Sequence, residues 1–225
     1  MESATSQKLT IPYIGDVLLP DNQEIVDRIK RDGISVDIDK INWLEYSFKP
    51  IVKLYAGFSE EYLWLSYEVK GDYFRAKALA DQESVWQDSC VEFFIFAGGD
   101  KGFDNWLGAI YRNFEFNVLG VCLSAVGTKS KRASLSPSEM NQILRFPSID
   151  RNNLPSEGDC FDWNMSVAIP LKLLGIGQGS KFRANFYKCG DLTAHPHFLS
   201  WNSINVTIPD FHLPQFFGEV ELGKR

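Results

Sequence analysis

The sequence lacks the signals of several common protein classes. It has no apolar run near the ~18–20 residues of a membrane-spanning helix, so we expect no membrane insertion. Lysine and arginine number 23 against 29 acidic residues, which gives a net charge of −6. Nucleic-acid binding needs a basic face, so we expect no nucleic-acid partner.

The amino terminus also lacks a targeting signal. Residues 1–7 contain no basic stretch followed by an apolar one, so they do not form a signal peptide. The compartment stays open: periplasmic or extracellular if a leader has been removed, cytoplasmic if Met1 is the native start.

Cysteine is scarce and widely spaced. No C-x-x-C pair occurs, so we expect neither a zinc knuckle nor a thioredoxin-type redox pair. Free cysteine is among the most buried residue types, so we predict buried free thiols. Disulfides are the alternative, and the sequence does not choose among three pairings. The four cysteines are Cys90, Cys122, Cys160 and Cys189.

Motifs for phosphate, dinucleotide and acyl-transfer chemistry are missing as well. There is no G-x-x-x-x-G-K-[ST] loop and no G-x-S-x-G elbow. Gly175, Gly177 and Gly179 form a loose G-x-G-x-G, but a dinucleotide site needs a strand before it and a helix after it. We predict a loop there.

What the chain has in quantity is aromatic side chains, at 14% of 225 residues. With 44% hydrophobic and 23% charged residues, the composition is that of a folded protein large enough for one core. We found no internal repeat or linker. We therefore predict a flexible tail over residues 1–10 and a single domain over residues 11–225.

Period-two alternation dominates the chain and predicts strands. In residues 111–118, one face is almost wholly polar, as expected for an antiparallel sheet with one solvated side. The strands are expected over 62–69, 91–96, 111–118, 163–169, 182–187 and 220–222.

Helix signals are few and short. Asp21 is a cap candidate for a helix over 22–31, in which Ile25 and Ile29 share a face. A capping box at Ser136 predicts helical turns over 137–145, and Pro170–Leu174 predicts a single turn before Gly175. Short strands separated by turn residues predict an all-β, antiparallel β-sandwich of jelly-roll or immunoglobulin type with a few short helices.

Catalytic and metal-binding constellations are not evident. His195 and His197 lie at strand spacing and His212 follows, but a metal site usually needs four ligands, or three and water. We expect these histidines to hydrogen-bond locally or to line a polar pocket. Asp88, Glu92 and Glu115 are imaginable as a glycosidase pair, but linear spacing cannot show such a pair. We therefore do not expect an enzyme.

A tryptophan in a polar loop is the most informative feature. Trp86 precedes the strand that carries Glu92. An indole can stack on the C–H face of a sugar while carboxylate, amide and guanidinium groups bind its hydroxyls. Candidate polar groups are Glu92, Arg112, Asn113 and Asn117. The alternative for both Trp86 and Trp201 is a core anchor.

The segment Val85–Ile95 resembles the "W-x-D-D-x-V-E-x-F-I" segment of family nine carbohydrate-binding modules. Downstream blocks follow in the order of that family, and the resemblance covers about residues 36–222. It implies a β-sandwich that clamps the end of a glucan or xylan chain between two tryptophans. It also implies structural calcium ions and, usually, fusion to a glycoside hydrolase. These blocks are 111–117, 163–171, 183–187, 200–201 and 209–218.

Carried over residue by residue, the resemblance makes Trp86 the first stacking tryptophan and Glu92 a hydroxyl-binding carboxylate. Arg112 falls within a residue or so of a sugar-binding arginine, and Trp201 is the nearest candidate for the second tryptophan. The chain departs from the pattern at Ser89, which replaces the second acid, and it has no D-x-D-x-D-G calcium loop.

Three functions follow as hypotheses. The first is non-catalytic binding of a saccharide or chain end, with a glycoside hydrolase as partner. The second is a glycoside-processing enzyme using Glu92 or Asp88. The third is a sandwich for a protein partner or another cofactor such as haem, with His195, His197 or Met165 as ligands. The binding residues of the first hypothesis are Trp86, Glu92, Arg112, Asn117 and Trp201.

Overall fold

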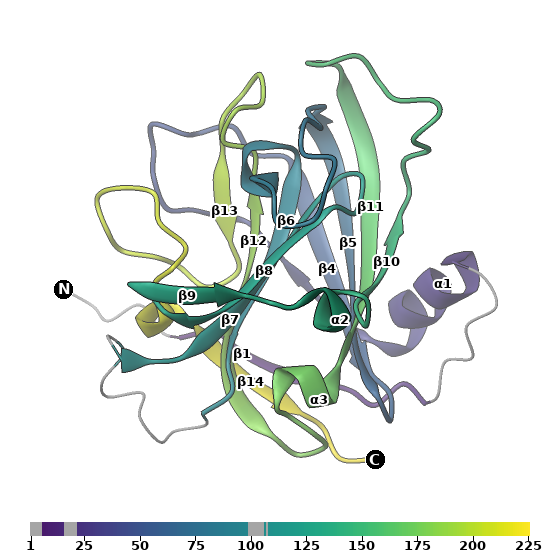
Figure 1. Cartoon of the computed structure of the whole chain (residues 1–225), viewed down its shortest axis with the longest axis vertical. Helices are drawn as coiled ribbons and strands as arrows, with labels where there is room; N and C mark the ends of the chain where they lie inside the picture. The colour runs from purple at the N-terminus through teal and green to yellow at the C-terminus, as the bar shows by residue number, and fades with distance from the viewer. Residues whose placement is uncertain (1–5, 16–21, 99–105, 107) are drawn as a thin grey trace.

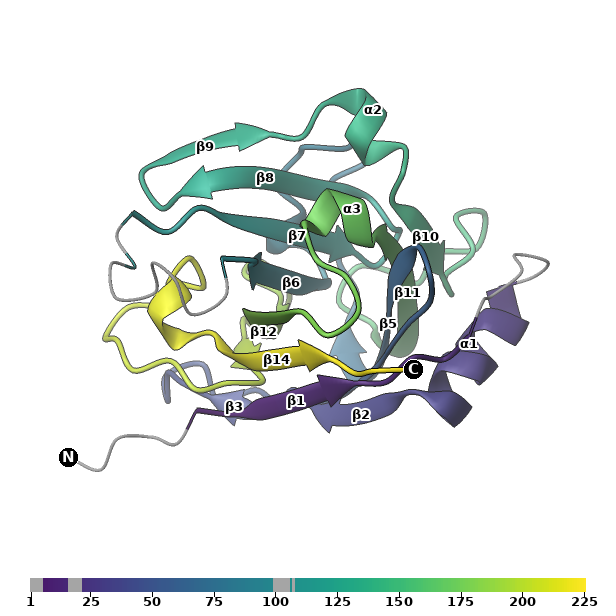
Figure 2. The same ribbon diagram turned by 90° about the horizontal axis from the view of Figure 1, so that it is seen from below.

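The computed structural model describes residues 6–15, 22–98, 106 and 108–225. In this part of the chain, the strands form two facing sheets of nine and five strands (Figure 1, Figure 2). The nine-stranded sheet has the path β1-β14-β12-β6-β7-β8-β9, with β13 and β3 joined beside β12, and the five-stranded sheet has the order β10-β11-β5-β4-β2. Neighbouring strands are antiparallel except for the parallel pair β1 and β14. The predicted antiparallel β-sandwich is confirmed.

The elements have the following bounds. The strands of the larger sheet are β1 (Lys8–Ile11), β3 (Lys40–Ile41), β6 (Cys90–Phe96), β7 (Tyr111–Asn117), β8 (Cys122–Thr128), β9 (Lys131–Ser134), β12 (Lys181–Cys189), β13 (Phe198–Ser200) and β14 (Gly218–Leu222). The strands of the smaller sheet are β2 (Ile34–Asp37), β4 (Ile51–Phe58), β5 (Tyr62–Tyr73), β10 (Leu144–Pro147) and β11 (Cys160–Pro170). The helices are α1 (Asn22–Asp32), α2 (Pro137–Met140) and α3 (Leu171–Leu174), with the 3₁₀ turns η1 (Val85–Gln87) and η3 (Pro214–Phe216).

All six predicted strands are present, and several are longer than expected. Two boundaries differ from the prediction. Lys8–Thr10 pair with β14, so this part of the expected tail belongs to the sheet, and residues 1–5 lie outside the described residues. The helix expected over 137–145 ends at Met140, because Leu144 onward pairs with β11 as β10.

The other helix predictions hold where the structure describes them. The capping box at Ser136 is formed, and α3 ends at Gly175, whose φ of 72° is in the left-handed region that favours glycine. Asp21, the expected cap of α1, lies outside the described residues. No helix in the described ranges has the length and apolar character needed to cross a membrane.

The core lies between the sheets and is rich in aromatic rings. Phe93 of β6 lies between its cross-strand neighbours Phe114 of β7 and Phe186 of β12. Their ring centroids are 6.0 and 5.3 Å from that of Phe93, and all three side chains are fully buried. Stacked rings in register fix these three strands relative to one another. On the outer face of the smaller sheet, Ile25 and Ile29 of α1 pack on Trp64.

A buried ionic cluster joins the two sheets. The Lys188 ammonium of β12 lies 3.0 Å from the Asp72 carboxylate of β5, and both side chains are fully buried. Lys188 also donates to the Cys189 carbonyl, at 2.6 Å, and contacts His197 Nε2 at 2.9 Å. Trp163 Nε1 donates to Asp72 at 2.8 Å. These bonds satisfy the charges that burial would otherwise penalise.

The histidine and cysteine predictions have mixed outcomes. His197 hydrogen-bonds locally through Nδ1 and the His195 carbonyl, at 2.8 Å, so both of its ring nitrogens are occupied. Met165 is fully buried in the core. All four cysteines are free thiols, as predicted. Three are buried, but Cys160, at the start of β11, is exposed.

Burial of His197 gives the protein a specific acid sensitivity. Burial, and next the Lys188 charge, lower the pKa of His197 to about 3, below the ~6.5 of an unfolded histidine. Between about pH 6.5 and pH 3, His197 is therefore protonated in the unfolded chain and neutral in the folded chain. The folded state loses free energy of unfolding as the pH falls through this range. Between pH 7 and pH 5, this one histidine removes about 2 kcal/mol of unfolding free energy.

We predict that His197→Gln, whose amide can replace both hydrogen bonds, flattens the pH dependence of unfolding by about that amount. Urea unfolding of wild type and variant at pH 7 and pH 5 measures the difference, in which the contributions of the other groups cancel. Equal pH slopes for the two proteins would contradict the assignment.

Candidate functional site

A pocket opens on the face of the nine-stranded sheet that points away from the core. Because side chains alternate along a strand, the neighbours of Phe93 and Phe114 project to this face. They include the cross-strand pair Glu92 and Glu115. The pocket has a volume of about 460 Å³. Its lining comprises Trp86, Glu92, Phe94, Asn113, Glu115, Leu123, Ala125, Arg132, Cys189, Asp191, Phe198, Pro209, Asp210, Phe211 and His212.

Trp86 forms an exposed aromatic wall of this pocket. It lies in η1, where Val85 is buried as an anchor, while 37% of Trp86 remains exposed. The Trp86 carbonyl accepts hydrogen bonds from the Asp191 amide at 3.3 Å and from Cys189 Sγ at 3.6 Å. The backbone of the tryptophan is therefore fixed to the end of β12 while its ring stays available to a ligand.

Asp88 fixes the loop that carries Trp86. Its buried carboxylate accepts hydrogen bonds from the Arg75 guanidinium at 2.7 Å and from the amides of Lys77 and Ala78 at 3.0 Å. Asn117 Nδ2 donates a further bond at 3.1 Å. A carboxylate with this many donors is committed to structure. Asp88 is therefore not the catalytic acid that the enzyme hypothesis considered.

The floor of the pocket is acidic and poorly solvated. Burial raises the pKa of Glu115 and of Asp191 to about 7, and burial and the neighbouring Glu115 raise the pKa of Glu92 well above its usual range. Glu92 Oε1 accepts a hydrogen bond from the Cys189 thiol at 3.1 Å, and Glu115 Oε1 accepts one from Asn113 at 2.8 Å. Protonated carboxyl groups at neutral pH can donate hydrogen bonds to ligand oxygens as well as accept them.

Arg132 of β9 provides a guanidinium at the pocket wall. Its Cζ lies 4.1 Å from the ring centroid of Tyr111, a cation–π contact, and its Nη2 donates to Asn113 and to the Ala125 carbonyl. A 2.9 Å hydrogen bond joins Tyr111 Oη to His212 Nδ1. Burial lowers the pKa of His212 to about 4, so the imidazole is neutral at pH 7.

The structure brings some predicted residues together and leaves others apart. Trp86, Glu92 and Asn113 line the pocket. Asn117 does not line the pocket. Its Nδ2 donates hydrogen bonds to Asp88 and to the Ala78 carbonyl, and its Oδ1 accepts hydrogen bonds from the backbone amides of residues 119 and 121. The histidine prediction of a polar pocket holds for His212.

Arg112 and Trp201 also lie outside the pocket lining. Arg112 alternates with Asn113 and projects from the other face of β7, toward Glu139 of α2. Trp201 is 4% exposed and packs in the core against Phe186 at 5.6 Å. Its ring lies so close to Gly218 that a Cβ there would come within 2.4 Å of it. Trp201 therefore does not face Trp86 across the pocket.

Several residues that line the pocket were not predicted from the sequence. Arg132, Asp191 and Phe198 carry no local signal, because only the pairing of β9, β12 and β13 brings them to the pocket. The segment 209–212 had a signal, since it belongs to one of the ordered blocks of the resemblance. Its residues Pro209, Asp210, Phe211 and His212 all line the pocket.

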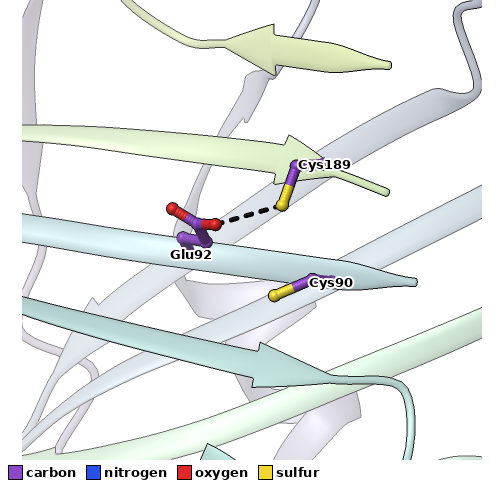
Figure 3. A group of neighbouring side chains, drawn as sticks. All are labelled: Cys90, Glu92 and Cys189. Atoms are coloured by element: carbon purple, nitrogen blue, oxygen red, sulfur yellow. Dashed lines mark hydrogen bonds between the residues drawn. The ribbon is translucent and has the colours of Figure 1, made fainter. Parts of the chain in front are cut away.

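The one grouping of potential metal-ligating side chains found in the described ranges does not have the composition of a calcium site. Within the described ranges, the grouping of at least three acidic, histidine or cysteine ligands is Cys90, Glu92 and Cys189 (Figure 3). Calcium prefers six to eight oxygen ligands, and two thiols do not suit it. Ser89, at the position of the missing acid, is buried and bonds to the Tyr73 carbonyl at 2.8 Å and the Arg75 amide at 3.2 Å. Structural calcium stays a prediction.

Comparisons with known proteins identify similar folds and one matching family. A comparison with curated proteins gave no match. Among solved structures, a candidate carbohydrate-binding protein from Bacteroides uniformis ATCC 8492 is 30% identical, with a TM-score of 0.86 over 97% of this chain and 100% of its own. Two structures of a family 9 carbohydrate-binding module from Caldicellulosiruptor kristjanssonii share the fold. The glucose complex is 12% identical and covers 97% of both chains. The cellotriose complex is 11% identical and covers 97% of this chain and 95% of its own. Each has a TM-score of 0.61.

The model of one protein family covers most of the chain. The model described as carbohydrate-binding family 9 matches residues 23–222, which include both sheets apart from β1 and every residue that lines the pocket. The ordered blocks of the sequence, the two-sheet sandwich and this match lead to one conclusion: the chain belongs to carbohydrate-binding family 9.

Proposed function

We propose that this protein binds a saccharide, without catalysis, in the pocket beside Trp86. The observation that carries the proposal is a half-exposed indole on a fixed backbone, next to buried groups that donate and accept hydrogen bonds. The indole covers the C–H face of a sugar ring, and Glu92, Asn113, Glu115 and Arg132 bind its hydroxyls. A volume of about 460 Å³ suits a small ligand.

The ligand class we propose is the end of a glucan or xylan chain. The family 9 modules from Caldicellulosiruptor kristjanssonii bind glucose and cellotriose, which supports a glucose-based ligand. A compact pocket holds a chain end better than the middle of a long polymer. As part of the proposal, the module holds such a chain for a glycoside hydrolase that acts on it. We expect a Kd in the micromolar to millimolar range, about 4–8 kcal/mol.

The aromatic wall gives the first test. We predict that Trp86→Ala weakens binding of cellotriose or a xylo-oligosaccharide at least about tenfold, or about 1.4 kcal/mol, because the stacking surface is lost. Trp201→Phe is the matched control, because Trp201 lies in the core. This variant should bind the oligosaccharide with the affinity of the wild type. Calorimetry on folded variants measures both. Unchanged affinity in Trp86→Ala, or steady release of hydrolysis products that Glu92→Gln abolishes, would contradict the proposal.

Two arginines in the same sheet, Arg132 of β9 and Arg112 of β7, give a second test. Arg132→Gln should weaken glycan binding about tenfold, because a charged donor at the wall is lost. Arg112→Gln should leave the affinity unchanged, because its side chain points away from the pocket. The same titration distinguishes them, and the opposite order of effects would place the sugar on the other face of β7.

The Asp88 anchor gives a third test. Asp88→Asn replaces a buried carboxylate, which accepts several hydrogen bonds, with a neutral amide. We predict a loss of about 3–5 kcal/mol in the free energy of unfolding. Glycan affinity should fall too, because the loop that holds Trp86 loosens. Glu157→Gln, in an exposed ion pair with Lys77 on the same loop, is the control and should leave both unchanged. Equal urea midpoints for Asp88→Asn and Glu157→Gln would contradict this role.

A further inference from the structure

Two thiols and a carboxyl group meet beside the pocket: Glu92 and Cys189 belong to its lining, and Cys90 is fully buried. Cys90 and Glu92 project from β6, and Cys189 projects from β12 as the direct cross-strand partner of Cys90. Both sulfur atoms and a carboxylate oxygen all lie within 4.8 Å of one another. Figure 3 shows the Glu92 carboxylate turned toward Cys189, with Cys90 beside it on the same strand. The three side chains are 0–2% exposed.

This spacing is close to that of a tetrahedral zinc site. With zinc–sulfur bonds of about 2.3 Å and zinc–oxygen bonds of about 2.0–2.2 Å, ligand atoms lie roughly 3.5–3.8 Å apart. Glu92 Oε1 and Cys189 Sγ are already 3.1 Å apart. Small side-chain rotations therefore suffice to bring the three atoms to a common ion. Thiolates select soft or borderline cations and disfavour calcium and magnesium.

The surroundings also favour a cation. Glu115, the cross-strand partner of Glu92, and Asp191, two residues after Cys189, line the same pocket, and a bound cation favours the ionised form of such neighbouring carboxyl groups. Glu92 and Cys189 themselves line the pocket, which gives an ion a path from solvent. The Trp86 carbonyl lies 3.6 Å from Cys189 Sγ and helps to orient that sulfur.

We propose that Cys90, Cys189 and Glu92 bind a zinc-type divalent cation at the floor of the pocket. Binding converts both thiols to thiolates and the carboxyl group to a carboxylate, and the protons leave to solvent through the pocket. Three protein ligands leave a fourth coordination position, which water fills from the pocket side. The inference does not depend on the proposed function, because it is tested without any sugar.

The experiment uses the full chain, reduced and freed of metal, in a Cys160→Ser background that removes the exposed thiol. Titration with zinc chloride in a calorimeter should give one saturable site. Cobalt(II), as a spectroscopic probe of tetrahedral zinc sites, should produce a sulfur-to-cobalt charge-transfer band and visible bands of tetrahedral cobalt. Zinc should also raise the thermal unfolding temperature, because it binds the folded state.

Variants identify the ligands. Cys90→Ala and Cys189→Ala should each bind zinc at least about 100-fold more weakly than the parent. Loss of a group that only supports a metal ligand already weakens binding by up to roughly that factor, and these variants lose a ligand itself. Cys122→Ala is the matched control: it removes a buried thiol outside the grouping and should bind zinc like the parent. Urea unfolding of each variant verifies that it is folded.

Three results would overturn the proposal. The first is no saturable zinc binding by the parent, or a cobalt complex without the sulfur band, and this readout needs no variant. The second is equal affinity in Cys90→Ala, Cys189→Ala and Cys122→Ala. The third is a Cys90–Cys189 disulfide in peptide maps of the purified protein that persists after mild thiol treatment, because the paired sulfurs then cannot bind a metal.

Discussion

The pairing of β6 with β7 on one side and β12 on the other is the constraint on which the structure depends. It places Phe93, Phe114 and Phe186 in one stacked row inside the sandwich. Because side chains alternate, the same register places Glu92 beside Glu115 on the opposite face, and Cys90 beside Cys189. A shift of one residue in any of these strands would exchange core and pocket. The hydrophobic core thus fixes the chemistry of the site.

Buried polar groups fix the parts of the molecule that surround these three strands. Lys188 and Asp72 link the two sheets, and Asp88 gathers the amides of the loop that holds Trp86. Each charge is buried, but each has several partners, so the cost of removing it from water is offset. The result is a rigid scaffold with one large ring left exposed to a ligand. A binding protein gains affinity from such a surface, since little conformational freedom is lost on binding.

The sequence predicted the architecture better than the site. Alternation identified the strands that form the core, because burial on one face leaves a period of two. It did not identify β4 and β8, which have eight and seven residues, or the shorter strands β1, β2, β3, β9, β10 and β13. The pocket residues that β9 and β13 contribute were therefore missed too. The polar face of 111–117 was predicted to be solvated, yet Asn113 and Glu115 are buried in the pocket floor. Arg112 was predicted as a site residue from an approximate match, and a shift of one position along a strand suffices to turn a side chain to the other face.

A crystal structure of the protein with a bound cello- or xylo-oligosaccharide tests the central claim most directly. The account predicts a terminal sugar ring stacked on the Trp86 indole, with hydroxyls bonded to Glu92, Asn113 and Arg132. Trp201 should remain in the core, out of contact with the ligand. A sugar bound elsewhere on the sandwich, with the pocket beside Trp86 filled only by water, would contradict the account.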